Sequence, residues 1–187
     1  LVHGIEVAND DTYSEEALEI ALKNNLTILG TSDIHGLVDW DFNIPDGGHR
    51  PLTFILTKDN SQSSIREALF QGNTFVWFKD LLIGKKENIE PIINSNLKLK
   101  SNGYVGETTL LEVKISNLSS ASINIEYLGE YTFYKNSKFL SIPPNSSINI
   151  QLKTISKLKK INLPFKILNV VTGLRKSLKL DYDLEIY

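Results

Sequence analysis

The feature that most constrains this 187-residue chain is a change of hydrophobic pattern near residue 96. Before it, short apolar runs alternate with helical patterns, which is typical of an α/β sheet. After it, apolar and polar residues alternate strictly, and turn sequences separate the runs, which is typical of a β-sandwich. We therefore predict an α/β portion over residues 1–95 and an Ig-like β-sandwich over 96–187. Three runs show the strict alternation most clearly: 111–116, 123–127 and 148–152.

Charge and composition exclude several classes of function. The chain has 20 basic and 22 acidic side chains, a formal net charge of -2, and no run of five like charges, so it lacks the pattern of a nucleic-acid-binding protein. No apolar segment approaches the roughly 18 residues that span a bilayer. Cysteine is absent, which excludes disulfides and thiolate ligands. Because exported proteins tolerate this composition, we favour an extracytoplasmic location, although many cytoplasmic proteins also lack cysteine.

The start of the chain indicates a piece of a longer protein. The sequence begins at Leu1, contains no methionine, and enters an apolar strand pattern within its first seven residues. No charged segment precedes an apolar one, so no signal peptide is recognisable. We expect an internal or C-terminal part of a larger chain, with any signal upstream.

The first portion predicts a strand, a helix and a second strand in close succession. Residues 4–7 form a short apolar run, and a second run begins at Leu26. Between them, Thr12-x-x-Glu15 matches a helix capping box, and Ser14 is a competing N-cap. Such a unit predicts two neighbouring parallel strands joined by a right-handed crossover.

Secondary-structure propensities and the positions of capping and turn-forming residues predict further elements. Residues 36–50 are polar and rich in glycine, which predicts a long loop. A helix is predicted to open with Ser64-x-x-Glu67 and to end near Gly72. The remaining predictions are strands at 51–57 and 74–78, a short helix at 87–93, and turns at 117–122, 143–146 and 171–173.

The strongest candidate site is Asp33-x-His35, which follows the apolar run directly. If the backbone stays extended, both side chains point to the same side, because side chains alternate along a strand. The carboxyl end of a buried strand is where α/β proteins place metal and catalytic groups. A carboxylate and an imidazole suit Zn, Mn or Fe, so we predict that Asp33 and His35 are metal ligands. The alternative is an aspartate that caps a turn beside a hydrogen-bonded histidine.

Two ligands are too few for a complete site, since a catalytic zinc takes at least three protein groups. The remaining histidines, His3 and His49, have no ligand spacing to one another. Either the preceding part of the protein supplies the other ligands, or no tight site forms.

A second candidate is the glycine-rich segment that carries His49 and Arg50. Arginine binds phosphate bidentately, and histidine can hydrogen-bond or protonate a leaving oxygen. We predict that both residues contact a phosphate group. The alternative is a surface loop with incidental charges.

Taken in order, these motifs resemble the last part of a PHP (polymerase and histidinol phosphatase) domain. The resemblance covers about residues 3–93 and is closest to the two-domain PHP phosphoesterases of Bacteroidetes-like bacteria, in which a small β-sandwich follows. It rests on His3-Gly4-Ile5-Glu6-Val7-x-Asn9, on 25–35, on 49–53 and on 65–78.

The resemblance implies a distorted β/α barrel with two or three divalent metal ions at the strand ends. Asp33 and His35 correspond to the final Asp-x-His ligand pair of the family, and Glu6 and Asn9 correspond to positions that line the site region. The opening His-x-His and the intermediate ligands of the family have no counterpart here. The resemblance therefore implies that this chain holds only part of the metal cluster and is inactive alone.

We accordingly expect the parent protein to be a hydrolase, a metal-dependent phosphoesterase. It would cleave a phosphate mono- or diester of a small molecule through metal-bound hydroxide, and the upstream half of the domain would complete the site. Neither a nucleic-acid partner nor a membrane span is expected. The alternative from a different class is a non-catalytic binding module, in which the barrel is degenerate and the sandwich binds a glycan or a protein.

Overall fold

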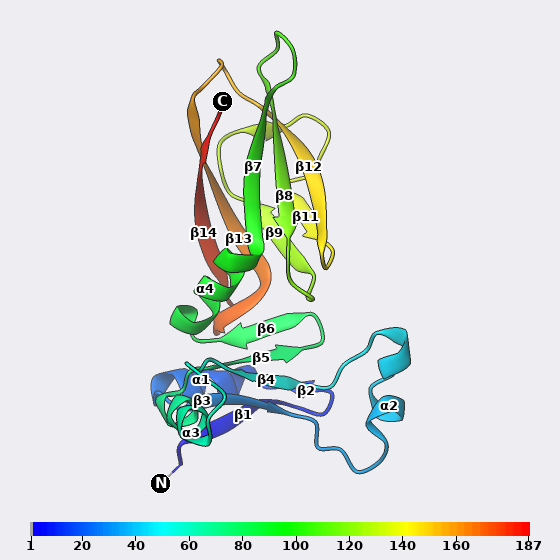
Figure 1. Cartoon of the computed structure of the whole chain (residues 1–187), viewed down its shortest axis with the longest axis vertical. Coiled ribbons are helices and arrows are strands. Elements are labelled where there is room, and N and C mark those ends of the chain that lie inside the picture. The colour runs from blue at the N-terminus through cyan, green and yellow to red at the C-terminus, as the bar shows by residue number, and fades with distance from the viewer. Residues whose placement is uncertain (1) are drawn as a thin grey trace. The chain divides into compact units, whose positions relative to one another are not determined.

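The computed structural model describes residues 2–187 and divides the chain into two compact units. The first unit runs to Glu90 and includes Val170–Lys176, and the second comprises Pro91–Asn169 and Ser177–Tyr187. The second unit is mostly β, whereas the first contains both strands and helices (Figure 1). The short segment Val170–Lys176 therefore belongs by its contacts to the first unit. The domain boundary between residues 95 and 96, and the assignment of residues 1–95 to a barrel, stay predictions.

The first unit contains a small sheet in the order β2-β1-β3. Strands β1 (Gly4–Asn9) and β3 (Thr27–Thr31) run parallel, with Ile5 opposite Ile28. Helix α1 (Glu15–Lys23) connects them, which confirms the predicted pair of neighbouring parallel strands. The two-residue strand β2 (Thr12–Tyr13) pairs only with the last two residues of β1.

The start of α1 decides between the two predicted caps. Ser14 is the N-cap, and its hydroxyl accepts a hydrogen bond from the backbone N–H of Ala17 at 3.1 Å. The capping box at Thr12 is therefore wrong. Thr12 lies in β2, opposite Asn9, so its position in the antiparallel ladder keeps it out of the helix start.

A second, antiparallel group of strands completes the first unit. It consists of β4 (Leu52–Ile55), β5 (Thr74–Phe78) and β6 (Leu81–Gly84), and β6 also pairs in parallel with Val170 and Val171. Strand β5 has the predicted bounds, whereas the strand predicted at 51–57 is shorter.

Helix α3 (Gln62–Gln71) begins earlier than the sequence predicted. Ser61 is its N-cap and accepts a hydrogen bond from the N–H of Ser64 at 3.2 Å, so the predicted opening at Ser64 is wrong. The predicted end is confirmed, because Gly72 follows the helix with φ of 71°, a left-handed conformation that favours glycine.

The core of the first unit packs the two groups of strands against α1. Gly30 allows the close approach of β3 to β5, because a Cβ at this position would lie 2.5 Å from a methyl carbon of Val76. A larger residue would force the strands apart. The buried core residues are Val7, Ala8, Leu18, Ala21, Ile28, Val76, Phe78 and Ile83.

Threonine hydroxyls, rather than a further strand, satisfy backbone groups of β3. The Thr53 hydroxyl accepts a hydrogen bond from the N–H of Gly30 and donates one to its carbonyl, both at 2.8 Å. The Thr74 hydroxyl donates to the carbonyl of Ile28 at 2.7 Å. Because buried backbone groups need partners, these two side chains substitute for a ladder along this edge.

The second unit is a two-sheet β-sandwich, as predicted. One sheet has the order β10-β12-β8-β7, and the other contains β11-β9-β13 with β14 paired to β13. Inward-facing apolar side chains of both sheets, such as Val113, Ile125 and Phe165, are fully buried. The strands are β7 (Leu97–Tyr104), β8 (Leu110–Asn117), β9 (Ile123–Tyr127), β10 (Thr132–Phe133), β11 (Phe139–Ile142), β12 (Ser146–Lys153), β13 (Lys160–Gly173) and β14 (Lys176–Glu185).

Three local predictions need correction. The helix predicted at 87–93 is α4 (Lys86–Asn96), longer at both ends. The turn predicted at 171–173 is wrong, because β13 continues to Gly173 and the chain reverses at Leu174 and Arg175. The loop predicted over 36–50 contains two short helices, α2 (Val38–Asp41) and the 3-10 helix η1 (Ile44–Asp46). No helix within residues 2–187 is long and apolar enough to cross a membrane.

Candidate functional site

The predicted ligand pair lies on the loop that follows β3. The strand ends at Thr31, and Asp33 has φ of 46°, so the backbone does not stay extended as the sequence argument assumed. The two side chains still meet, with 3.5 Å between Asp33 Oδ1 and His35 Nε2. A turn with a left-handed aspartate, a conformation that this residue tolerates, therefore brings them together.

Both side chains of the pair are open to solvent. The exposed fraction is 60% for Asp33 and 88% for His35, so a ligand can reach their polar atoms. Within residues 2–187 the structure contains no group of three or more His, Asp, Glu or Cys side chains that could hold a metal ion. The pair can therefore supply two donor atoms, but a tight site needs at least one more.

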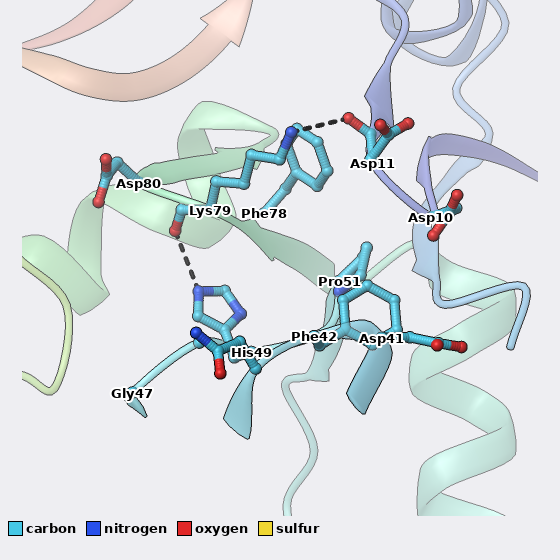
Figure 2. A pocket seen from close by; sticks show the side chains of 12 residues that line it. Asp10, Asp11, Asp41, Phe42, Gly47, His49, Pro51, Phe78, Lys79 and Asp80 are labelled. Atoms are coloured by element: carbon cyan, nitrogen blue, oxygen red, sulfur yellow. Dashed lines mark hydrogen bonds between the residues drawn. The ribbon is translucent and has the colours of Figure 1, made fainter. Parts of the chain in front are cut away.

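A cavity of about 430 Å³ lies beside the turn between β5 and β6 (Figure 2). Asp10 and Asp11, which follow β1, contribute to its wall, as do Asp41, His49 and Lys79. Asp10 and Asp11 were not predicted as site residues, although two adjacent carboxylates shortly after a predicted strand were a usable signal.

The predicted ligands Asp33 and His35 are not among the residues that line this cavity. Asp41 connects the two regions, because a Cβ on Gly36 would lie 3.3 Å from its carboxylate. The cavity wall therefore reaches the segment that follows His35.

The structure gives His49 a different environment from the predicted phosphate contact. Its Nδ1 lies 2.8 Å from the carbonyl of Arg50, and its Nε2 lies 3.0 Å from the carbonyl of Lys79. The ring also packs against Trp77, with 4.1 Å between ring centroids. These contacts anchor the glycine-rich loop to the turn after β5, and the phosphate contact of His49 stays a prediction that they do not support.

The other candidate residues are dispersed. Arg50 is exposed and forms no ion pair with any residue of the described range 2–187. His3 contacts the ring of Phe70 edge-on, with 4.9 Å between ring centroids. Glu6 accepts a hydrogen bond from the Asn9 amide at 2.8 Å. Among the predicted metal ligands and phosphate contacts within residues 2–187, Asp33 and His35 form an ion pair, at 3.5 Å.

Comparison with known proteins supports the sandwich directly. A sequence model of a family described as an Ig-like domain (DUF5001) matches residues 97–183. No curated protein matches the chain. The Ig-like character of the second portion is therefore supported by sequence as well as by the two packed sheets.

The whole chain is similar to one solved two-domain protein. This is a crystal structure from Bacteroides vulgatus ATCC 8482, a two-domain protein containing a predicted PHP-like metal-dependent phosphoesterase. The TM-score is 0.87 and the sequence identity is 28%, and the match covers 97% of this chain and 52% of that one. The chain therefore spans about half the length of the protein it matches.

Proposed function

We propose that this chain is part of a metal-dependent phosphoesterase of the PHP type, in which Asp33 and His35 supply two metal ligands. The observation that carries the proposal is the 3.5 Å approach of the carboxylate and the imidazole on an exposed loop after a parallel strand. Similarity to a two-domain protein that contains a predicted PHP-like phosphoesterase supports it. Residues 1–95 would then form the last part of a distorted β/α barrel.

The two side chains fit a divalent metal in part. A carboxylate oxygen and an imidazole nitrogen suit Zn, Mn or Fe, and both side chains are exposed enough to accept one. The missing donors would come from the part of the protein outside this chain, since the chain covers 52% of the similar structure. As the resemblance to PHP domains implies, the complete domain would hold two or three ions.

The proposed chemistry rests on the two ligands and on Arg50, an exposed cation. A divalent metal, when bound, polarises phosphoryl oxygens and lowers the pKa of water, so that water loses a proton and becomes a nucleophile towards phosphorus. In this chain, Asp33 and the neutral ring of His35 would hold the ion, and the Arg50 guanidinium would bind phosphate oxygens bidentately. His49 is omitted, because both ring nitrogens already face carbonyl oxygens. The substrate class is a phosphate mono- or diester of a small molecule.

The test uses the full-length protein and measures both metal content and hydrolysis of p-nitrophenyl phosphate and its diester. Asp33→Ala and His35→Ala should each reduce turnover on the order of 100-fold and reduce bound metal. Arg50→Ala should raise KM more than it lowers kcat, because it would act in binding.

Asp39→Ala and His3→Ala serve as matched controls, since they remove the same side-chain types from positions without a proposed ligand role. Both should stay within about twofold of the wild type. Wild-type metal content and turnover in Asp33→Ala or His35→Ala would contradict the proposal.

A further inference from the structure

The outer face of the sheet β10-β12-β8-β7 carries an unusual set of lysines. We call this set the lysine face and define it by Lys98, Lys100, Lys114 and Lys153, all exposed. It belongs to a unit with eleven lysines, no arginine and seven carboxylates, a formal net charge of +4. The first unit, by the same count, carries -6. The positive charge of the second unit is therefore concentrated in lysine side chains.

The register of the sheet places like charges against one another. Lys100 on β7 lies directly opposite Lys114 on β8, and Lys114 lies opposite Asn149 on β12. Like charges at opposed positions of neighbouring strands destabilise a sheet. Lysines on the edge strand β7 discourage edge-to-edge aggregation, but this reason does not apply to Lys114, which lies on an interior strand.

The opposite face of the same sandwich offers an internal comparison. There, Lys138 pairs with Glu126 at 2.9 Å, and Lys160 pairs with Asp183 at 2.9 Å. On the lysine face, Glu112, two residues before Lys114 on β8, accepts a hydrogen bond from Asn102 at 2.9 Å instead.

Within residues 2–187 no ion pair joins any lysine of the lysine face to a carboxylate. Two lysines of the opposite face thus have carboxylate partners, whereas the lysines of the lysine face are left for an external anion.

The side chains between the lysines are hydrogen-bonding groups. Ser116 and Ser147 face one another across β8 and β12, with 2.9 Å between their hydroxyl oxygens. Asn149 and Gln151 add amides along β12. Such a surface matches a ligand that has many hydroxyl groups as well as negative charge.

An exposed aromatic ring lies at one edge of the lysine face. The N–H of Tyr134 donates to the carbonyl of Gln151 at 2.8 Å, which places Tyr134 beside β12, and 46% of it is exposed. Lys135 and Lys153 each lie 5.3 Å from the centroid of its ring. Both ammonium groups lie over the ring, so a sugar that stacks on it displaces them, and they then pair with its carboxylates.

We propose that the lysine face binds an acidic polysaccharide. Its carboxylates pair with Lys100, Lys114 and Lys153, its hydroxyls bond to the amides and serines, and one sugar ring stacks on Tyr134. From Ser147 to Lys153, β12 extends about 20 Å, so the ligand is a chain of several sugars.

Other polyanions fit less well. Proteins that bind nucleic acids generally use arginine forks and several stacked aromatic rings, whereas this unit has no arginine and the face has one exposed ring. A membrane surface would call for apolar side chains that insert beside the lysines, and the face between them is polar.

The test is calorimetric titration of the 187-residue chain with polygalacturonate at low salt, with neutral dextran as the comparison. Polygalacturonate should bind and dextran should not, and binding should weaken as salt is raised. Lys100→Gln/Lys114→Gln should weaken binding by about tenfold or more, an effect of two lost charge contacts. Lys98 is left in place because it donates to the carbonyl of Asn94 at 3.0 Å.

The matched control removes the same charge from the other sheet. Lys166→Gln/Lys179→Gln should change affinity by less than about twofold, because Lys166 on β13 and Lys179 on β14 belong to the sheet opposite the lysine face. Tyr134→Ala should weaken binding several-fold, whereas Tyr134→Phe should retain it. Equal weakening by the two double variants would overturn the proposal, as would a lack of binding. Tighter binding to a DNA duplex or to phosphatidylserine vesicles would overturn it as well.

Discussion

The two units satisfy the backbone of their strands in different ways. In the sandwich, β8 pairs along its whole length with β12, and from Leu111 to Asn117 with β7. In the first unit, one edge of β3 is satisfied by the hydroxyls of Thr53 and Thr74. Ladders distribute stability over many residues, whereas the edge of β3 depends on a few side chains. The strand that precedes the candidate site is therefore held by interactions that single substitutions can remove.

The largest expected effect on stability is in the sandwich core. Phe165 is fully buried, so Phe165→Ala should lower the free energy of unfolding of the second unit by about 3–5 kcal/mol. Urea denaturation followed by far-UV circular dichroism measures this effect. A loss below about 1 kcal/mol would show that the sheets are not packed as described.

Thr53→Val tests the contribution of a hydroxyl contact to β3 in the first unit. Valine keeps the shape of threonine but leaves the N–H and carbonyl of Gly30 without their partner, so the first unit should lose about 2 kcal/mol. Tryptophan fluorescence reports this unit alone, because both tryptophans, Trp40 and Trp77, lie in it.

Thr57→Val is the control for that substitution. The Thr57 hydroxyl bonds to the carbonyl of Asp59 in an exposed turn, so its loss should cost less than about 0.5 kcal/mol. Equal losses of unfolding free energy in Thr53→Val and Thr57→Val would mean that the hydroxyl contacts to β3 stabilise the fold no more than an exposed one does.

A smaller effect is expected at the start of α1. Ser14→Ala should cost about 1 kcal/mol, because the N–H of Ala17 loses its acceptor. Thr12→Ala should cost less, since the Thr12 side chain does not cap the helix. A larger loss of thermal stability in Thr12→Ala than in Ser14→Ala would instead support the capping box at Thr12.

The smallest effect at neutral pH concerns Tyr13, whose buried hydroxyl has no hydrogen-bond partner among the described residues. Tyr13→Phe should leave stability unchanged within about 0.5 kcal/mol at pH 7. Burial, followed by the nearby charge of Glu15, raises the pKa of Tyr13 to about 12.

The raised pKa of Tyr13 makes the free energy of unfolding depend on pH in the alkaline range. The folded state holds the phenol proton more tightly than the unfolded state, so the stabilisation is complete below pH 10 and is lost as pH rises towards 12. Urea midpoints measured from pH 9 to 12 should fall less steeply for Tyr13→Phe than for the wild type. Identical slopes would contradict the raised pKa.

Much of the fold could be predicted from local pattern. Strict alternation located the strands around 111–116, 123–127 and 148–152, and aromatic and β-branched residues located β5. Pattern could not predict the length of β13, because its continuation to Gly173 depends on pairing with β6. The opposition of Lys100 and Lys114 also depends on strand register, which includes a shift between Ser101 and Gly103.

The candidate site could also be predicted only in part, because it too depends on a backbone turn and on long-range contacts that local pattern does not specify. The proximity of Asp33 and His35 follows from their spacing, but the turn that produces it does not, since it requires a left-handed aspartate. The environment of His49 was unpredictable, because its ring contacts the carbonyl of Lys79, thirty residues away along the chain. Local sequence carries no information on such a contact.

The most direct test of the central claim is anomalous X-ray diffraction from crystals of the full-length protein, recorded at the absorption edge of the bound metal. We expect a metal ion about 2.0–2.2 Å from a carboxylate oxygen of Asp33 and a ring nitrogen of His35. A metal ion bound elsewhere, with neither side chain in its coordination sphere, would contradict the account.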